Sequence, residues 1–304
     1  KPPSQRSPSR PGPGVLADVR DNGRVSEPVD FTYRVGGPLG SRARRAGLWF
    51  NPAFFAFTAA TLTWLILVWR QVPCRPLPGD AFPNPFLRMC YSDIPILYLN
   101  RDLSIGSGIY TDIALEYPVL IGGFVAVTRA ITGLLGAVIS PEATFDEQLA
   151  ASQLFFQVNA IALFGCFLVT VWVHLKMGRH SPRVGYAGPV RVWDALLIAA
   201  SPIVALNGLI NWDMFAVMLT SIGLLIWSRK YPFIAGGVLG LAFAAKFYPV
   251  LVLVAITLIC VRSGHYRALT RAWIGAVVAW LAVNVPVMIF AWQGWSKFWT
   301  LNAD

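Results

Sequence analysis

The feature that most limits the folds open to this chain is a series of apolar stretches, most of them long enough to form a helix that crosses a membrane. A hydrocarbon core of roughly 30 Å needs about 20 residues of helix. The stretches are continuous rather than alternating, so they indicate helices and not the strands of a barrel. Charged residues make up 13% of the chain, against about 25% in an ordinary soluble domain. The sequence therefore predicts an all-α polytopic membrane protein.

The positions of Lys and Arg predict how the chain crosses the membrane. The net charge is +10, and the basic residues gather at the ends of apolar stretches and in the N-terminal tail rather than on one helical face. We interpret them as a topology signal and expect no nucleic-acid partner. Residues 1–46 are rich in Pro, Gly, Ser and Arg, which predicts a disordered basic tail in the cytoplasm. Residues 47–304 form the predicted transmembrane domain.

About seven spans satisfy the rule that basic loops stay in the cytoplasm. The first span, about 48–69, leads into a large external loop, residues 70–148. The later spans are predicted at about 149–175, 192–206, 214–227, 233–261 and 273–292. Residues 233–261 form a helical hairpin in this interpretation, with Lys246 and Pro249 at its outer apex. The chain stops just after an amphipathic stretch, so we expect a fragment of a longer protein with further spans beyond Asp304.

Residues 117–139, inside the external loop, are open to two interpretations. The stretch is long enough to span the membrane, but a full crossing would place Glu142 and Asp146 in the cytoplasm and the basic residues 176–191 outside. A helix that lies along the outer interface, or dips in and returns, keeps all later loops in order. Gly122, Gly123, Arg129 and Gly133 also make a poor span. We expect an interfacial helix near 117–139.

Two of the four cysteines fall in the external loop. An oxidising compartment would allow a disulfide between Cys74 and Cys90, worth roughly 3 kcal/mol, with two free thiols as the alternative. Cys166 and Cys260 lie within spans and are interpreted as small apolar side chains. The three His residues are scattered, and the loop has no Asp-x-Asp pair. We therefore expect no metal site.

Polar and ionisable residues gather in three segments that are predicted to share the outer side. The first segment runs from Cys90 to Asp102, and the second is Glu116-Tyr117-Pro118. The third consists of the turn at residues 207–213 together with Lys246. Grouping of this kind, rather than any single residue, is what indicates a candidate site.

The order of these segments resembles the actinobacterial members of glycosyltransferase family 87, integral membrane enzymes of the C-type superfamily. The matching stretches are CYSDIPILY, RDLSIGSGIY, EYPVL, NGLINWD and GGVLGLAFAAKFYP. The resemblance implies a C-type glycosyltransferase fold whose large first external loop carries interfacial helices. The commonest family form has two prolines after the Tyr and a Gln in the later turn, where this sequence has Pro118-Val119 and Gly208-Leu209-Ile210-Asn211.

The resemblance also implies an activity. Such enzymes transfer a sugar, commonly mannose, from a polyprenyl-phosphate carrier to a lipid or glycan acceptor. The reaction takes place on the outer face of the cytoplasmic membrane, as part of cell envelope biosynthesis. The lipid-linked sugar is then a co-substrate, membrane lipids surround the protein, and no cofactor is expected.

Asp93 is the predicted catalytic residue. In the superfamily an acidic residue of the first external loop acts as a base, and inversion at an anomeric carbon needs a carboxylate to take the acceptor's proton. Lys246 and Arg101 are the candidates for contact with the donor phosphate, because charge builds on the departing group. The alternatives are a solvated or capping Asp93, a Lys246 that extends to the interface, and a solvated Arg101.

The same three segments supply the candidate substrate-binding residues Tyr98, Glu116, Tyr117, Asn211 and Asp213. Glu116 and Asp213 could instead cap the helices that follow them. The Gly-rich run at 236–240 lacks the Gly-Lys-Ser/Thr ending of a phosphate loop, so we interpret it as a site of close helix packing.

Two other functions stay open at the level of the sequence. A transporter or lipid flippase would need ionisable residues near the membrane midplane and corresponding broken helices in two halves, and the sequence shows neither. A non-catalytic membrane scaffold that has kept the fold is the second alternative, against which the presence of Asp93 and Lys246 argues weakly.

Overall fold

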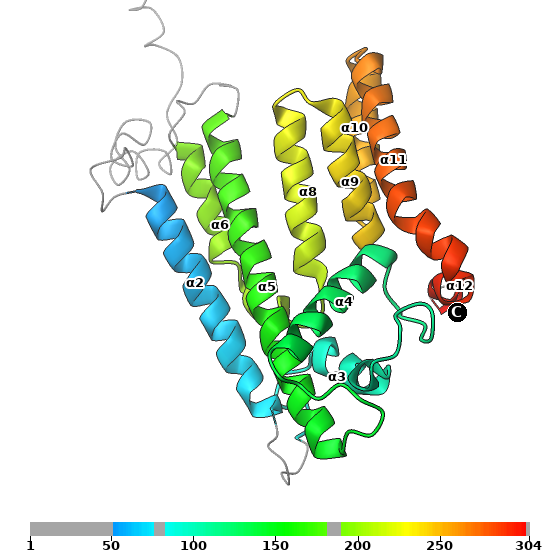
Figure 1. The fold of residues 1–304 in the computed structure, drawn as a ribbon. Coiled ribbons are helices and arrows are strands. Elements are labelled where there is room, and N and C mark those ends of the chain that lie inside the picture. Colours follow the sequence, from blue (N-terminus) through cyan, green and yellow to red (C-terminus); the bar gives the residue numbers. More distant parts are fainter. Residues whose placement is uncertain (1–50, 76–82, 181–189, 302–304) are drawn as a thin grey trace, which may run out of the picture. The chain divides into compact units, whose positions relative to one another are not determined.

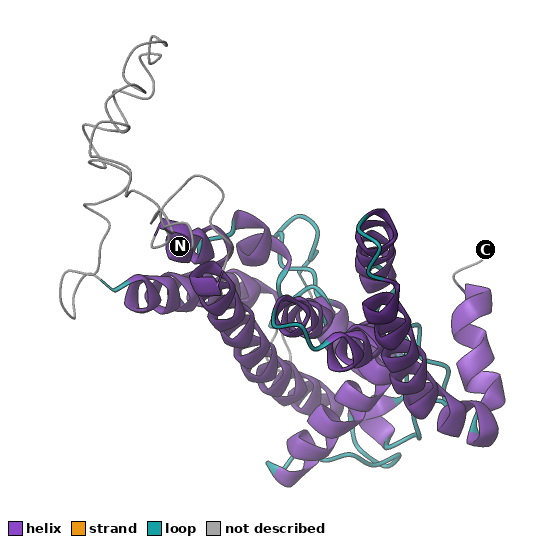
Figure 2. Cartoon of the chain, turned by 90° about the horizontal axis from the view of Figure 1, so that it is seen from above, coloured by secondary structure: helices purple, strands orange, loops and turns teal. Residues whose placement is uncertain are grey.

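The structure is a computed structural model that describes residues 51–75, 83–180 and 190–301. The chain divides into two compact units, Lys1–Arg44 and Arg45–Asp304, and all described residues belong to the second. The predicted tail, residues 1–46, lies outside the described residues. The described part is built of helices and loops without a strand (Figure 2). The chain is thus an all-α protein, as the apolar stretches predict.

The helices follow one another along the chain as Figure 1 shows. Their bounds are α2 Pro52–Gln71, η2 Val72–Cys74, α3 Asp93–Asn100, η3 Leu103–Ile105, α4 Val119–Leu134, α5 Phe145–His180, η4 Val190–Asp194, α6 Ala195–Ala199, α7 Pro202–Asn207, α8 Asp213–Ser228, α9 Pro232–Ala245, α10 Pro249–Arg262, α11 Tyr266–Phe290 and α12 Trp292–Leu301.

Three segments of the described part are long and apolar enough to cross a membrane, namely Pro52–Cys74, Phe145–Met177 and Tyr266–Phe290. Shorter apolar helices of 10–17 residues, among them α8, α9 and α10, make up most of the remaining helices. Large apolar side chains are exposed on the membrane-length helices and on the shorter ones, for example Ile161 on α5 and Leu258 on α10. Such exposure is expected where lipid rather than water is the solvent. The figure of about seven spans stays a prediction.

The predicted span at 192–206 is interrupted in the structure. The chain forms η4, α6 and α7 there, with a break at Ala200 and Ser201. Pro202 begins α7 and has no N–H to donate to Ile198, so a continuous helix would lack one of its hydrogen bonds. The stretch predicted as a span is therefore built of three short helical segments rather than one continuous helix.

The predicted hairpin over 233–261 is present. Helix α9 ends at Ala245, Lys246 is extended with φ −153° and ψ 158°, and α10 begins at Pro249. Proline is well placed at the first turn of a helix, where no partner for its missing N–H is needed. The break therefore falls where the sequence places it.

Helix α4 covers the core of the stretch 117–139. It begins after Pro118 and packs against α5, α9 and α11. Figure 1 shows it inclined to α5 and α8. Its depth in the membrane stays a prediction.

Helices α9 and α11 are held close by glycine. A Cβ added at Gly236 would lie 1.9 Å from the carbonyl oxygen of Ala272, and one at Gly240 would lie 2.3 Å from that of Ala276. On α11, a Cβ at Gly275 would lie 2.1 Å from the carbonyl oxygen of Phe233. Backbones that approach this closely need small residues at the contact. The Gly-rich run is a packing surface, as interpreted from the sequence.

This contact predicts a contrast between two neighbouring glycines. Gly236→Ala should destabilise the protein by about 1–3 kcal/mol, because α9 and α11 must move apart. Gly237→Ala is the matched control, since its Cβ would meet only the Gly275 oxygen at 3.7 Å, and it should be neutral or slightly stabilising. Thermal unfolding of the purified proteins in detergent measures both. Equal unfolding midpoints for the two variants would contradict the packing described here.

Candidate active site

Asp93 is the first residue of α3, and the turn before α8 fixes it there. The Ser92 hydroxyl donates to the carbonyl oxygen of Leu209 at 2.6 Å. The Asp93 backbone N–H donates to the carbonyl oxygen of Ile210 at 2.7 Å. Ser92 also caps α3 by accepting from the Ile94 N–H at 3.3 Å. Two segments far apart in the sequence are therefore joined directly at the predicted catalytic residue.

Both carboxylate oxygens of Asp93 accept a hydrogen bond from a tyrosine. The Tyr91 hydroxyl donates to Oδ1 at 2.7 Å, and the Tyr117 hydroxyl donates to Oδ2 at 2.8 Å. The hydrogen bond to Asp93 raises the pKa of Tyr91 to about 12. Burial, followed by the hydrogen bond to Asp93, raises the pKa of Tyr117 well above its usual range. Both phenols thus stay protonated at neutral pH and orient the carboxylate.

The ring of Tyr117 links Asp93 to the predicted phosphate-binding cation. The Lys246 Nζ lies 5.0 Å from the centroid of this ring, within the range of a cation–π contact. The same Nζ forms an ion pair with Asp213 Oδ1 at 2.7 Å. Tyr117 was predicted to bind substrate. In the structure it contacts a carboxylate through its hydroxyl and an ammonium group through its ring face.

Trp212 packs against the ring of Tyr117. The two rings meet edge to face with centroids 5.1 Å apart. Trp212 is fully buried, and its Nε1 donates to Asn159 Oδ1 on α5 at 2.7 Å. The position of Tyr117 therefore depends on a buried polar contact between α5 and the turn before α8.

Both cations predicted to bind phosphate have protein partners. Lys246 is paired with Asp213, so the protein itself supplies a countercharge for this lysine. Arg101 forms an ion pair with Glu116, and each side chain is about one third exposed. Since the two pairs are open to solvent, neither cation is removed from reach of a ligand.

Two predicted substrate-binding residues have other roles in the structure. Tyr98 is fully buried and stacks on Phe155 with ring centroids 4.6 Å apart, so it belongs to the core. The Asn211 Oδ1 accepts a hydrogen bond from the Asp213 N–H at 3.0 Å and so holds the start of α8. The direct substrate contact predicted for Tyr98 is therefore wrong in this conformation.

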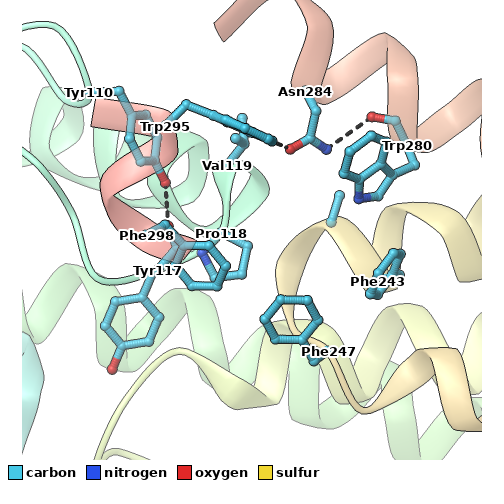
Figure 3. Close-up of a pocket in the computed structure, with 11 residues that line it drawn as sticks. Tyr110, Tyr117, Pro118, Val119, Phe243, Phe247, Trp280, Asn284, Trp295 and Phe298 are labelled. Atoms are coloured by element: carbon cyan, nitrogen blue, oxygen red, sulfur yellow. Dashed lines mark hydrogen bonds between the residues drawn. The ribbon is translucent and has the colours of Figure 1, made fainter. Parts of the chain in front are cut away.

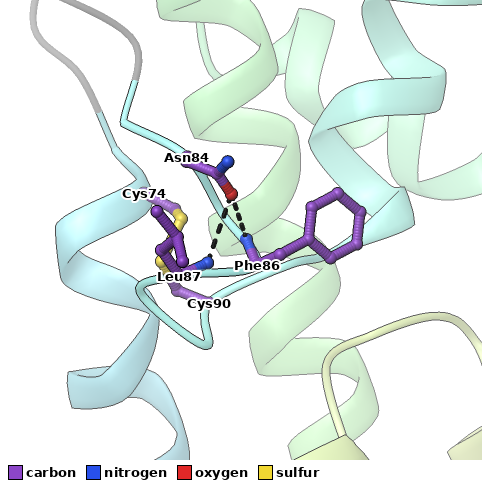
Figure 4. Close-up of a disulfide and its surroundings, with 5 residues drawn as sticks. All are labelled: Cys74, Asn84, Phe86, Leu87 and Cys90. Carbon is purple, nitrogen blue, oxygen red and sulfur yellow. Dashed lines mark hydrogen bonds between the residues drawn. A yellow bond between two sulfur atoms is a disulfide. The ribbon is translucent and has the colours of Figure 1, made fainter.

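The disulfide proposed from the sequence is formed in the structure (Figure 4). The sulfur atoms of Cys74 and Cys90 are 2.06 Å apart. Between the two cysteines, Asn84 Oδ1 accepts hydrogen bonds from the backbone N–H groups of Phe86 and Leu87 and so holds a turn. Phe86 stacks on Tyr91 with centroids 5.0 Å apart. The disulfide-closed loop therefore helps to position a tyrosine that holds Asp93.

An aromatic pocket adjoins the other side of Tyr117 (Figure 3). Its walls are Tyr110, Tyr117, Pro118, Val119, Phe243, Ala244, Phe247, Trp280, Asn284, Trp295 and Phe298. The Tyr110 hydroxyl donates to the Tyr117 carbonyl oxygen at 2.7 Å, and Trp295 Nε1 donates to Asn284 Oδ1 at 3.0 Å. The cavity volume is about 10 Å³, which is room for about one water molecule. A cavity of this volume is too small for a sugar.

Sequence reasoning missed three residues of this cluster, namely Tyr91, Trp212 and Asn159. A signal existed for Asn159, because an amide in the middle of an apolar span needs a partner. Tyr91 and Trp212 lie within the stretches CYSDIPILY and NGLINWD, but nothing local distinguishes them from interfacial aromatic residues. Among the residues that the structure describes, no group of three or more His, Cys, Asp or Glu side chains is placed to hold a metal ion.

Comparison with known proteins identifies a family. The profile of glycosyltransferase family 87 matches residues 134–304, which is more than half of the chain. The matched region contains Asp213 and Lys246, whereas Asp93 and Tyr117 precede it. No curated protein and no solved structure matches the chain.

The buried contact between Trp212 and Asn159 predicts a stability effect. Trp212→Phe keeps an aromatic ring beside Tyr117 but leaves the Asn159 amide oxygen without its donor, which should cost about 1–3 kcal/mol. Adding Asn159→Leu removes the unpaired group and should restore part of that stability. Thermal unfolding in detergent measures the series. A Trp212→Phe protein as stable as the parent would show that the contact contributes nothing.

Proposed function

The chain belongs to glycosyltransferase family 87, and on that premise we propose that it moves mannose from a polyprenyl-phosphate donor to a lipid or glycan acceptor. The family indicates a membrane glycosyltransferase. The donor, the sugar and the reaction at the outer face of the cytoplasmic membrane are the parts that we propose. Family membership also favours transfer over transport or a purely structural role.

One observation carries the proposal. The Asp93 carboxylate is held by two tyrosine hydroxyls, and the ring of one of these tyrosines, Tyr117, contacts Lys246. Each carboxylate oxygen has two lone pairs. Among the described residues, Oδ1 accepts one hydrogen bond from Tyr91, and Oδ2 accepts one from Tyr117. A lone pair on each oxygen is left to accept a proton from an acceptor hydroxyl. The two tyrosines fix the direction of that lone pair before the substrate arrives, which lowers the cost of reaching the transition state.

The proposed reaction is a direct displacement. The acceptor oxygen attacks the anomeric carbon while its proton passes to the Asp93 carboxylate. The bond between that carbon and the phosphate oxygen breaks, and its electron pair leaves with the polyprenyl phosphate. The configuration of the sugar is inverted. No cofactor takes part in this scheme, because the donor lipid is itself the co-substrate.

Lys246 is proposed to offset the negative charge that builds on the departing phosphate. Its side chain is 27% exposed, and its partner Asp213 is 49% exposed. The ammonium group has three donor positions, so it can contact a phosphate while it keeps the ion pair with Asp213. Arg101, paired with Glu116, is the second candidate for the phosphate. Asn211 and Asp213 are proposed to lie next to the sugar.

The two roles predict different kinetic losses. Asp93→Asn keeps the shape of the side chain but cannot take the proton, so transfer should fall by about 10² to 10⁴ while donor binding stays nearly unchanged. Lys246→Met should weaken donor binding as well as rate, because a phosphate contact exists before and during the reaction. Turnover of a polyprenyl-phosphate sugar in membranes, with donor binding measured in parallel, separates the two effects.

Asp102→Asn is the matched control for this experiment. Asp102 lies in the same loop, is exposed and has φ 52°, a conformation that asparagine tolerates. The transferase activity of the Asp102→Asn protein should match that of the unchanged protein. Near-normal turnover by the Asp93→Asn protein would remove Asp93 as the base, and a large loss in Asp102→Asn would transfer that role to Asp102.

The proposed side of the membrane predicts a labelling pattern. Glu142, between α4 and α5, and Arg267, in the first turn of α11, are both exposed. A cysteine at position 142 should react with an impermeant thiol reagent added outside intact cells, and one at position 267 should react only after lysis. The native thiols Cys166 and Cys260 are buried and set the background. The reverse pattern would place Asp93 in the cytoplasm and exclude the proposed reaction.

A further inference from the structure

Two cavities, one beside α3 and one between α2 and α5, share the cation Arg75 and have no assigned role. The first, which we call the α3 cavity, has a volume of about 230 Å³. It lies between α2, α3, α5 and the segment that Cys90 ends. Its walls include Gln71, Arg75, Pro95, Leu99, Ser152 and Phe156. The second, the α2–α5 groove, has a volume of about 290 Å³ and is lined by Thr61, Trp64, Leu65, Val68, Arg75, Gln157, Ala160, Ile161 and Phe164. Arg75 borders both.

Buried donors without acceptors line the α3 cavity. Gln71 is 2% exposed, and its Nε2 has no hydrogen-bond partner among the described residues. The same holds for the buried Nε of Arg75, whose guanidinium lies 4.5 Å from the centroid of the Phe156 ring. Leaving a buried donor unsatisfied costs free energy. Two such donors on one wall indicate an acceptor that binds there.

The charge of the site indicates an anionic acceptor. No Asp or Glu is among the described residues that line either cavity. An arginine stays charged and matches phosphate oxygens with a planar fork of donors. The cavity therefore suits a phosphate group that is partly withdrawn from water.

The α2–α5 groove suits an apolar chain attached to that phosphate. Its walls are mainly apolar and aromatic. It runs between two helices that are long enough to cross a membrane, and Leu65 and Ile161 at its edge are 58% and 74% exposed. An apolar groove that ends at a cation is complementary to a lipid with an anionic head.

We propose that these two cavities bind one anionic phospholipid of the membrane, with its phosphate at Arg75 and Gln71 and an acyl chain in the α2–α5 groove. The site is separate from the proposed donor site, because Asp93, Tyr117 and Lys246 line neither cavity. Its walls include Cys90, Ser92 and Pro95, so a bound lipid supports the segment that carries Asp93. The proposal does not depend on the transferase reaction.

Lipid retention by the purified full chain tests the site. The probe is phosphatidylglycerol, compared with phosphatidylcholine, and the readouts are bound lipid in native mass spectrometry and thermal unfolding in detergent. Arg75→Gln should bind phosphatidylglycerol about tenfold more weakly, a loss of about 1.4 kcal/mol. Arg88→Gln is the matched control, since it removes the same charge from an exposed position in the same loop, and it should bind normally.

A second variant protects the test against misfolding. Val68→Trp fills the groove and leaves Arg75 in place, so it should also lose lipid while it keeps a cooperative unfolding transition. Wild-type retention of phosphatidylglycerol by both variants would overturn the proposal.

Three further outcomes would also contradict it. Binding of phosphatidylcholine as tight as that of phosphatidylglycerol would show that the site does not recognise charge. Protection against thermal unfolding by free glycerol phosphate as strong as that by the lipid would show that the groove holds no acyl chain. Displacement of the lipid by polyprenyl phosphate, with a higher KM for the donor in Arg75→Gln, would assign the cavities to the donor instead.

Discussion

Tyr117 lies between the carboxylate of Asp93 and the ammonium group of Lys246 and keeps the two from forming a direct ion pair. Opposite charges in a medium of low dielectric attract strongly and tend to pair directly. Here the Tyr117 hydroxyl binds Asp93 and its ring faces Lys246, while Asp213 supplies the countercharge of the lysine. Asp93 is therefore hydrogen-bonded by neutral donors, Tyr91 and Tyr117, and its charge remains available for chemistry.

The rest of the fold fixes the position of that ring. Trp212 packs against this ring in an edge-to-face contact and is itself hydrogen-bonded to Asn159 on α5. Lys246 reaches the ring from the apex between α9 and α10, and α9 is set by its close packing on α11. A displacement of any of these helices would separate a phenol, a carboxylate and a cation that act together. Small residues far from the cluster thus contribute to its geometry.

The sequence was sufficient for the features that depend on local composition or on the rule for basic loops. The break before Pro249 and the meeting of three polar segments are of this kind. The sequence also allowed the disulfide between Cys74 and Cys90 that the structure contains. The sequence was not sufficient to predict which side chains contact each other. The positions of charged residues indicate the side of the membrane on which a loop lies, but not the distance between two side chains. The Lys246–Asp213 pair and the burial of Tyr98 depend on how helices pack, and no local pattern records that.

The family match and the candidate base lie in different parts of the chain, and their connection is physical. Residues 134–304, which match the family, contain the cation and the turn before α8. Asp93 precedes them, but Ser92 and Asp93 are hydrogen-bonded to the carbonyl oxygens of Leu209 and Ile210 in that turn. These acceptors are backbone atoms, so the contact does not depend on the side chains at positions 209 and 210. A change of side chain at position 209 or 210 of this turn can therefore leave Asp93 held in place.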